Sequence, residues 1–264
     1  MPLFNFRLRP LPDLLQGWES LDFEVPQYLS SWFWLTDGWY WVATSQGDIP
    51  VGHPDFQAAS GLEPGLDLHL DYQVARFWQD LLDVSCDALE PLPEPFAGWV
   101  QSGAWAPWWS ALPEQESAGA DGELPFTAGG WWSARHLDMG YLMAPPVIRF
   151  WRVGNELTVE WDTHDKRVEG VLCWVEARGR LRLSVRQFQQ ELADFRERLD
   201  AAMRERLTGV EKLGLLDAGQ LAFLHRQHMA AIAEKGRPAE RVEWPEVLTA
   251  VRKLEQRSGL SLPR

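Results

Sequence analysis

Apolar and polar side chains alternate at the start of the chain, which is the pattern of a strand with one buried face. In residues 3–8, Phe4, Phe6 and Leu8 fall on one side of such a strand. The segment therefore predicts a strand. It lacks the basic, apolar and small-residue regions of a secretory signal.

Residues 29–42 carry aromatic side chains on both sides of the dipeptide Asp37-Gly38. A type I′ turn requires positive φ at both central residues, and Asp-Gly between aromatic runs is a strong signal for it. The pattern predicts a β-hairpin over residues 31–44 that turns at this dipeptide. One face of the hairpin would carry Trp32, Trp34, Trp39 and Trp41.

A second pair of alternating segments, residues 147–153 and 156–162, flanks Gly154-Asn155. A two-residue turn there predicts two antiparallel strands. The cross-strand partners would be Phe150 with Val159, Ile148 with Trp161, and Arg149 with Glu160 as an ion pair. Further strands, expected at 171–176 and 181–183, would extend an antiparallel meander over residues 147–183.

Apolar residues spaced by three and four predict helices elsewhere. One helix is expected at about 70–84. A longer one is expected at 184–207, where Ser184 and Gln187 fit a capping box. Two more helices are expected, at 218–235 and 245–257.

Strands that come first and helices that come last indicate an α+β protein rather than alternating βαβ units. The expected fold is an antiparallel sheet, formed by hairpin 31–44 and meander 147–183, packed against helices, with a helical C-terminal third. Residues 1–207 would form a single α+β domain with a mobile loop at about 110–130, a segment of disorder-like composition. Residues 208–264 would form a helical extension packed on that domain.

Charge is distributed unevenly along the 264 residues, whose net charge is −13. Residues 10–134 hold 19 acids and one base, Arg76, a balance of −18, whereas the other 139 residues hold 19 acids and 24 bases, a balance of +5. Three explanations remain open: acids scattered over a solvated face, acids docked on the basic second half, or acids that recruit a basic partner. Nucleic-acid binding through the acidic half is disfavoured, because acids repel phosphates.

The two cysteines, Cys86 and Cys173, are far apart and stand in apolar surroundings. This count excludes a disulfide framework and favours buried free thiols in a reducing cytoplasm. No segment reaches the roughly 18 uninterrupted apolar residues of a membrane helix, so no membrane partner is expected.

Motifs of catalysis and metal binding are absent: the chain has no HExxH, GxSxG, P-loop or GxGxxG segment, and no catalytic residue, metal or cofactor is predicted. His225 and His228 could form a metal pair, but no third ligand is identifiable. Asp162, His164 and Asp165 could perform acid–base chemistry. Core or interface histidines and a polar loop are the favoured interpretations of the two groups.

The candidate binding site combines tryptophans and charged residues on either side of the expected loop. Tryptophan, of which the chain has 16, serves cores, interfaces and ligand pockets alike. A pocket needs aromatic surface with a few convergent polar groups. The residues that fit this description are Trp108, Trp109, Trp131, Trp132, Arg135, His136, Asp138 and Tyr141. The alternative is that the tryptophans fill the core and that Arg135 and Asp138 form an internal salt bridge.

The segments LTDGWYW, WWSARHLDMGYL and IRFWRVGNELTVEWD resemble an uncharacterised bacterial family known only as a domain of unknown function. The resemblance covers roughly residues 3–207. It implies a bacterial origin and one continuous unit. It implies no activity, catalytic residue or cofactor.

Two classes of function follow from these patterns. The leading hypothesis is a non-enzymatic module that binds a basic protein through the acidic half, in concrete form a bacterial immunity protein that neutralises a basic toxin. The alternative is an enzyme or a small-ligand binding protein, with sugars among its ligands. It would use an aromatic pocket around Trp108, Trp109, Trp131 and Trp132.

Overall fold

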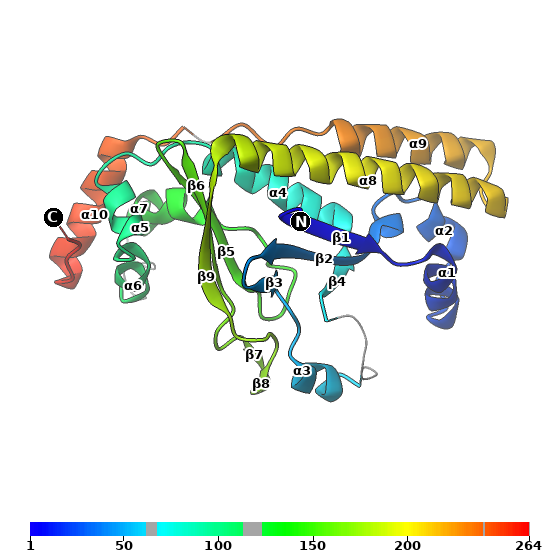
Figure 1. Cartoon of the computed structure of the whole chain (residues 1–264), viewed down its shortest axis with the longest axis horizontal. Helices are drawn as coiled ribbons and strands as arrows, with labels where there is room; N and C mark the ends of the chain where they lie inside the picture. Colours follow the sequence, from blue (N-terminus) through cyan, green and yellow to red (C-terminus); the bar gives the residue numbers. More distant parts are fainter. Residues whose placement is uncertain (62–67, 113–122, 240, 264) are drawn as a thin grey trace.

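The computed structural model describes residues 1–61, 68–112, 123–239 and 241–263 (Figure 1). Antiparallel sheets pack against helices, and the C-terminal part is helical, which confirms the predicted α+β class. In the part of the chain that is described, no helix combines the length and the apolar character needed to cross a membrane.

The first sheet is built around a central strand, β2. Its strands are β1 (Phe4–Leu8), β2 (Asp37–Thr44), β3 (Gly47–Ile49) and β4 (Leu70–Gln73). β1 runs antiparallel along one edge of β2, while β3 and β4 pair with different halves of β2. The strand predicted at residues 3–8 is confirmed.

The hairpin predicted over residues 31–44 is wrong at its turn. Trp34–Thr36 form a 3-10 helix, η1, and Asp37 and Gly38 begin β2 instead of joining two strands. Gly38 is required because β1 comes so close that a Cβ atom there would collide with the carbonyl oxygen of Arg7. The Asp-Gly signal therefore marks a close approach of two backbones. The expected face of four tryptophans does not form.

The second sheet confirms the predicted strand pair. β5 (Val147–Val153) and β6 (Glu156–Asp162) are antiparallel, and β9 (Arg178–Ser184) completes the sheet on the other edge of β6. The register is the one predicted: Phe150 lies opposite Val159, Ile148 opposite Trp161, and Arg149 opposite Glu160.

The strand predicted at 171–176 is wrong in its extent. Only Val171–Leu172 form a strand, β8, which pairs with β7 (Arg167–Val168) in a small hairpin. The following residues bond elsewhere: the Val175 N–H donates to the Val51 carbonyl, and the Ala177 N–H donates to the Thr163 hydroxyl. The third strand of the meander is therefore β9, which starts at residue 178.

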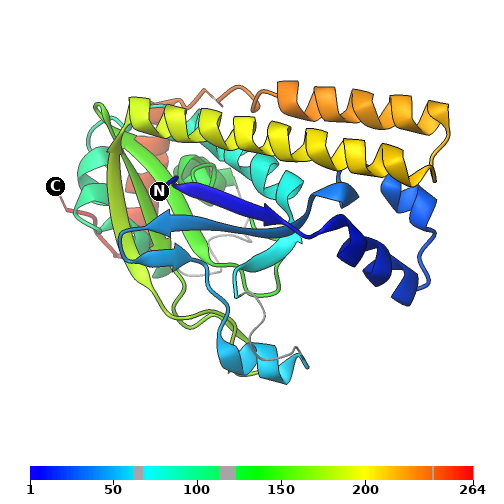
Figure 2. The same cartoon turned by 45° about the vertical axis from the view of Figure 1, so that its right-hand side comes forward.

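Three helices enclose the main core: α4 (Val74–Ala88), α8 (Val185–Leu213) and α9 (Ala218–Ala233). α8 runs along the length of the molecule with α9 beside it (Figures 1 and 2). The capping box is confirmed, since the Gln187 N–H donates to the Ser184 hydroxyl at 3.2 Å. α4 starts later than predicted because residues 70–73 form β4.

A second group of buried side chains, here called the tryptophan core, lies at the end of the molecule where the C-terminus is found (Figure 1). It is enclosed by α5 (Phe96–Gln101), α6 (Trp105–Ser110), α7 (Glu123–Ser133) and α10 (Trp244–Ser258). Its indoles belong to Trp99, Trp105, Trp108, Trp131, Trp132 and Trp151. α10 packs its apolar stripe on α7 and closes this core.

The loop predicted at 110–130 is interrupted by α7, which contains residues 123–130. Residues 113–122 of that prediction lie outside the described part of the chain. Gly129 and Gly130 suggest a loop when read locally, yet Gly129 lies inside α7 and is buried. A Cβ atom at this position would collide with the ring of Trp109. Close packing against a tryptophan therefore explains a glycine within the helix.

The opposite end of the molecule carries α1 (Leu11–Ser20) and α2 (Val25–Leu29), while α3 (Pro54–Ala59) lies beside the β7–β8 hairpin (Figure 1). α1 ends in a Schellman motif: the Phe23 N–H donates to the Trp18 carbonyl at 3.0 Å, and the Asp22 N–H to the Glu19 carbonyl at 3.1 Å. Asp22 has a left-handed backbone with a φ of 58°. This motif fixes the turn between the two helices.

Candidate functional site

Three of the four tryptophans proposed as a binding surface are core residues. Trp108, Trp131 and Trp132 have exposed fractions of only 6%, 3% and 4%. The rings of Trp108 and Trp131 pack at an angle on Trp105, which is fully buried, and the ring of Trp132 packs at an angle on Trp131. Most of this aromatic surface is therefore used to hold α6, α7 and α10 together.

Trp109 differs from the other three because it is only partly buried. Its ring lies against Gly129 on one side and stacks on Trp105 at a centroid distance of 5.7 Å. It also lines a pocket of about 460 Å³, together with Trp105 and Trp132. This pocket preserves part of the predicted aromatic site.

Arg135 is fully buried and serves as a structural cation. Its guanidinium donates to the carbonyl of Trp131 at 2.8 Å and to that of Glu90 at 3.3 Å, and the Glu90 carboxylate lies 3.9 Å away. Burial lowers the pKa of Arg135 to about 10, although nearby Asp87 and Glu90 favour its charge. The predicted salt bridge with Asp138 does not form, because Asp138 pairs with Arg76 at 3.3 Å.

Asp138 and Tyr141 belong to a polar cluster, defined here as Tyr40, Arg76, Asp80, Asp138 and Tyr141. The Tyr141 hydroxyl donates to Asp80 at 3.2 Å and accepts from the Tyr40 hydroxyl at 2.5 Å. Arg76 forms ion pairs with Asp80, at 3.1 Å, and with Asp138. Asp80, which lies on the buried side of α4, is not among the site residues predicted from the sequence.

The polar cluster borders a second pocket, of about 330 Å³, that is lined by Asp80, Asp138 and His136. Burial raises the pKa of Asp80 to about 7, although Arg76 opposes the shift. Burial and the charge of Arg149 lower the pKa of His136 to about 4. Both side chains are therefore uncharged near pH 5.5. Arg76 pairs with both Asp80 and Asp138, so neither of these two carboxyl groups is unpaired.

His225 and His228 point to different partners. The His225 ring pairs with Glu211 at 2.6 Å. His228 is buried, accepts from the Trp32 indole at 3.1 Å and meets Asp200 at 3.0 Å through its other nitrogen. Within the described residues, no group of three or more His, Cys, Asp or Glu is arranged to hold a metal ion.

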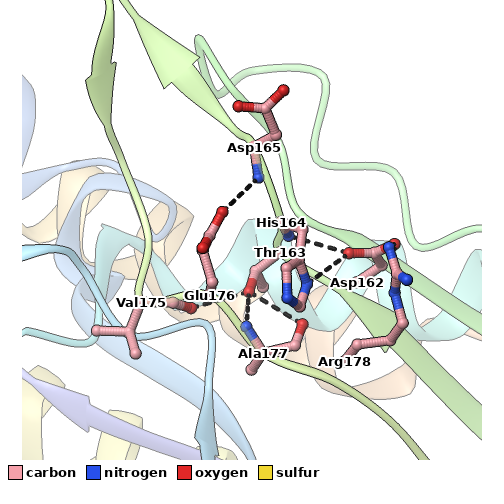
Figure 3. A network of polar contacts seen from close by, with 8 residues as sticks. All are labelled: Asp162, Thr163, His164, Asp165, Val175, Glu176, Ala177 and Arg178. Carbon is pink, nitrogen blue, oxygen red and sulfur yellow. Dashed lines mark hydrogen bonds and ion pairs between the residues drawn. The ribbon is translucent and has the colours of Figure 1, made fainter.

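The Asp162, His164 and Asp165 group is a polar turn after β6 (Figure 3). Asp162 accepts from the His164 N–H at 2.9 Å and from Arg178 at 2.7 Å; although burial opposes it, these bonds lower the pKa of Asp162. The Asp165 carboxylate points away from this site and pairs with Arg167 at 2.7 Å. The three residues therefore do not converge on one reactive point.

An exposed apolar group, mostly aromatic, lies on the turn between α1 and α2 and at the start of η1. Leu21, Phe23 and Trp34 have exposed fractions of 65%, 40% and 40%. The ring of Tyr28 joins them, since it stacks on Phe23 at 4.6 Å and contacts Trp34 at 5.2 Å. Because the rings of Phe23, Tyr28 and Trp34 are in contact and Phe23 and Trp34 are exposed, this group is a candidate interaction surface.

The exposed aromatic group is surrounded by acids. Glu19, Asp22 and Glu24 are exposed and form no ion pair within the part of the chain that the structure describes. We call this surface the acidic–aromatic tip and define it as Glu19, Leu21, Asp22, Phe23, Glu24 and Trp34. The sequence signal was three acids without a base over residues 18–34, but the hairpin prediction placed Trp34 on a strand.

Comparison with known proteins gives a family but no activity. No curated protein and no solved structure matches the chain. A family model matches residues 3–250, which extends the earlier resemblance through α9 and into α10. The chain therefore belongs to the family of unknown function DUF5984.

Proposed function

We propose that this protein is a non-enzymatic module that binds a basic protein through its acidic–aromatic tip. The observation that carries the proposal is the exposed group of Leu21, Phe23 and Trp34, together with three exposed acids next to it in sequence that form no ion pair with any described residue. Aromatic side chains at the centre and charged ones at the rim are typical of protein interfaces. The proposal commits to a basic partner because the rim contains acids and no base.

The charge of the tip supports fast and salt-dependent association. Exposed like charges attract an oppositely charged partner over roughly 8–10 Å at physiological salt. The exposed rings then supply apolar contact area after the encounter. In this form, the acids select the partner and the rings hold it.

A bacterial immunity protein that neutralises a basic toxin is the concrete form of the proposal. Such an inhibitor needs an acidic surface that covers a basic active site. The fold supplies a rigid support for this surface, because the Schellman motif fixes Asp22 and Phe23 relative to α1.

The test uses the full chain as bait in native lysate and with the purified product of the neighbouring gene, at low and at high salt. The wild-type protein should retain a basic protein at low salt and release it at high salt. The variant Glu19→Gln/Asp22→Asn/Glu24→Gln should lose this retention. Its matched control is Glu197→Gln/Glu234→Gln/Glu246→Gln, which removes the same charge from exposed residues on other elements.

A second pair of variants separates the apolar contacts from the charge. Phe23→Ala should weaken partner binding at least tenfold, the usual effect of losing an aromatic hot spot. Phe126→Ala changes an exposed phenylalanine at the other end of the molecule and should have no effect. Equal retention by wild type and by the triple tip variant would disprove the proposal.

Small-ligand binding is a second candidate function, favoured by the pocket beside Trp109. The pocket is walled by Trp105, Trp109 and Trp132, so two of the four tryptophans proposed for an aromatic site do line one. Its volume of about 460 Å³ suits a ligand of one or two rings. Sugars remain among the ligands that such a wall accepts.

A further inference from the structure

The pocket beside Trp109 has an aromatic wall on α6 and a charged floor on the second sheet. The floor side chains come from three neighbouring strands: Arg149 from β5, Glu160 and Asp162 from β6, and Arg178 and Arg180 from β9. Because the strands are paired in register, Arg149, Glu160 and Arg180 lie in one row across the sheet. The remaining charged residues, Asp162 and Arg178, form the next row.

Two of the three arginines are already neutralised. The Arg180 guanidinium pairs with Glu160 at 2.5 Å, and Arg178 pairs with Asp162 at 2.7 Å. The ion pair predicted between Arg149 and Glu160 is therefore replaced, although the two residues are cross-strand neighbours. Both carboxylates of the pocket are occupied by cations from β9.

The side chain of Arg149, unlike its backbone in β5, has no hydrogen-bond partner among the described residues. Its guanidinium lies over the ring of Trp132 at 4.8 Å, and its Nε is buried and makes no hydrogen bond. Burial lowers the pKa of Arg149, although Glu160 and Asp162 favour its charge. Stacking on an indole fixes the guanidinium plane without using its N–H donors. The pocket thus presents a positioned cation whose donors are free for a ligand.

We propose that this pocket binds a small organic anion, in which a carboxylate or phosphate group on a ring pairs with Arg149 while the ring packs on Trp109. This inference rests on the second candidate function and names its ligand class. Guanidinium donors match the oxygens of both anions. The net balance of the charged floor is one positive charge, against −13 for the whole chain.

The aromatic wall is preorganised to bind a ligand ring. Trp109 contacts Gly129 and stacks on Trp105 but is only partly buried, so little side-chain freedom is lost when a ligand packs on the part of the ring that remains exposed. An anion alone would use only the floor of the pocket. A ring without a charge would leave the donors of Arg149 without a partner, which is costly for a buried group.

The experiment measures tryptophan fluorescence of the full chain during titration with four probes: phenyl phosphate, benzoate, inorganic phosphate and phenol. The two ring anions should bind at least tenfold more tightly than phenol or inorganic phosphate. The variant Arg149→Gln should bind them at least tenfold more weakly than wild type. Its matched control is Arg182→Gln, a β9 arginine that pairs with Glu156 and does not line the pocket.

Each result distinguishes the anion inference from ligand binding as such. If phenol binds as tightly as phenyl phosphate, the anion inference is overturned while small-ligand binding stands. If inorganic phosphate binds as tightly as phenyl phosphate, the role of the ring is overturned. If no probe binds to wild type, both ideas fail. Since Arg149→Gln could disturb packing on Trp132, Arg149→Lys, which keeps the charge, should retain more of the affinity than Gln.

Discussion

The acidic–aromatic tip and the pocket beside Trp109 use the same kinds of residue in opposite ways. At the tip, rings are exposed, and the charged residues next to them are acids that form no ion pair within the described part of the chain. In the pocket, rings form an enclosed wall and the charges are arginines in excess of their carboxylates. Shape and the sign of charge, rather than aromatic content, therefore separate a protein-docking surface from a ligand site.

The acids in the first half of the chain fall into two groups, those paired with a base and those at the tip. Part of its charge is compensated by bases from elsewhere: Asp87 pairs with Arg237 at 2.8 Å, and Asp71 with Arg9 at 2.7 Å. Docking of acids on the basic second half, one of the three explanations from sequence, is supported by the Asp87–Arg237 pair. The three acids at the tip are different because the described residues offer them no base.

The largest expected effect contrasts a core tryptophan with an exposed one. Trp131→Ala should lower the free energy of unfolding by about 3–5 kcal/mol, because a buried ring in the tryptophan core is replaced by a cavity. Trp34→Ala should cost less than about 1 kcal/mol, since its ring is 40% exposed. Urea unfolding of both variants measures the difference.

For partner binding, we expect the exposed tryptophan to matter and the core tryptophan not to. Trp34→Ala should weaken capture of a basic partner. Trp131→Phe, which keeps an aromatic ring in the core so that the protein still folds, should leave capture unchanged. Similar losses of stability at both positions would show that the tip is part of the core, and the contrast between the two regions would then be lost.

Asp80 lies in neither region, so its substitution should change stability alone. In the folded protein its pKa is about 7, against an ordinary value of 3.8. Between these pH values the folded state retains a proton that the unfolded state releases, so stability falls as the pH rises, by up to about 4 kcal/mol. Asp80→Asn should remove this fall, measured by urea unfolding at several pH values between 4 and 8.

Titration of His136 changes the stability with pH in the opposite direction to titration of Asp80, so the two contributions must be separated. Its pKa, lowered to about 4, means that the unfolded state binds the extra proton between pH 4 and 6.5, so stability rises with pH there. Because both proteins contain His136, its contribution cancels when the free energy of unfolding of Asp80→Asn is subtracted from that of wild type. If this difference in free energy stays constant between pH 4 and 7, the raised pKa of Asp80 is contradicted.

Two adjacent glycines test the wall of the pocket. Gly129→Ala should destabilise the protein by about 1–3 kcal/mol, because its Cβ atom collides with the ring of Trp109. Gly130→Ala has no atom within 4 Å of the new Cβ and should stabilise α7 by about 0.5–1 kcal/mol. Thermal unfolding measures both. If the two variants behave alike, Trp109 is not held against Gly129.

The parts of the fold that could be predicted are those fixed by neighbours in sequence. The β5–β6 register depends on alternation around Gly154-Asn155, and the start of α8 depends on Ser184 and Gln187, three residues apart. The turn predicted at Gly38 is wrong because this glycine is required by the close approach of the Arg7 carbonyl oxygen on another strand. A contact between strands so far apart in sequence cannot be predicted from the residues around Gly38.

The candidate site was predictable only in part, for a similar reason. The sequence identified Trp109 and Trp132 as candidates, but part of the pocket floor comes from β9, which reaches the pocket through its pairing with β6. Among the described residues the Arg149 side chain has no hydrogen-bond partner, while Arg180 pairs with Glu160, the cross-strand neighbour of Arg149. Such competition between cations depends on three strands at once and cannot be read from one segment.

The smallest expected effect concerns Asp22, whose left-handed backbone with a φ of 58° is unfavourable for most residues. Asp22→Gly should stabilise the protein by about 0.5 kcal/mol, since glycine adopts this conformation freely but also gains freedom when unfolded. It also removes one acid from the tip and should therefore weaken capture of a basic partner. Asp22→Asn is the control, because asparagine tolerates the conformation and loses only the charge. Equal weakening by both variants would assign the effect to charge, whereas a larger loss with glycine would assign it to the rigidity of the turn that presents Phe23.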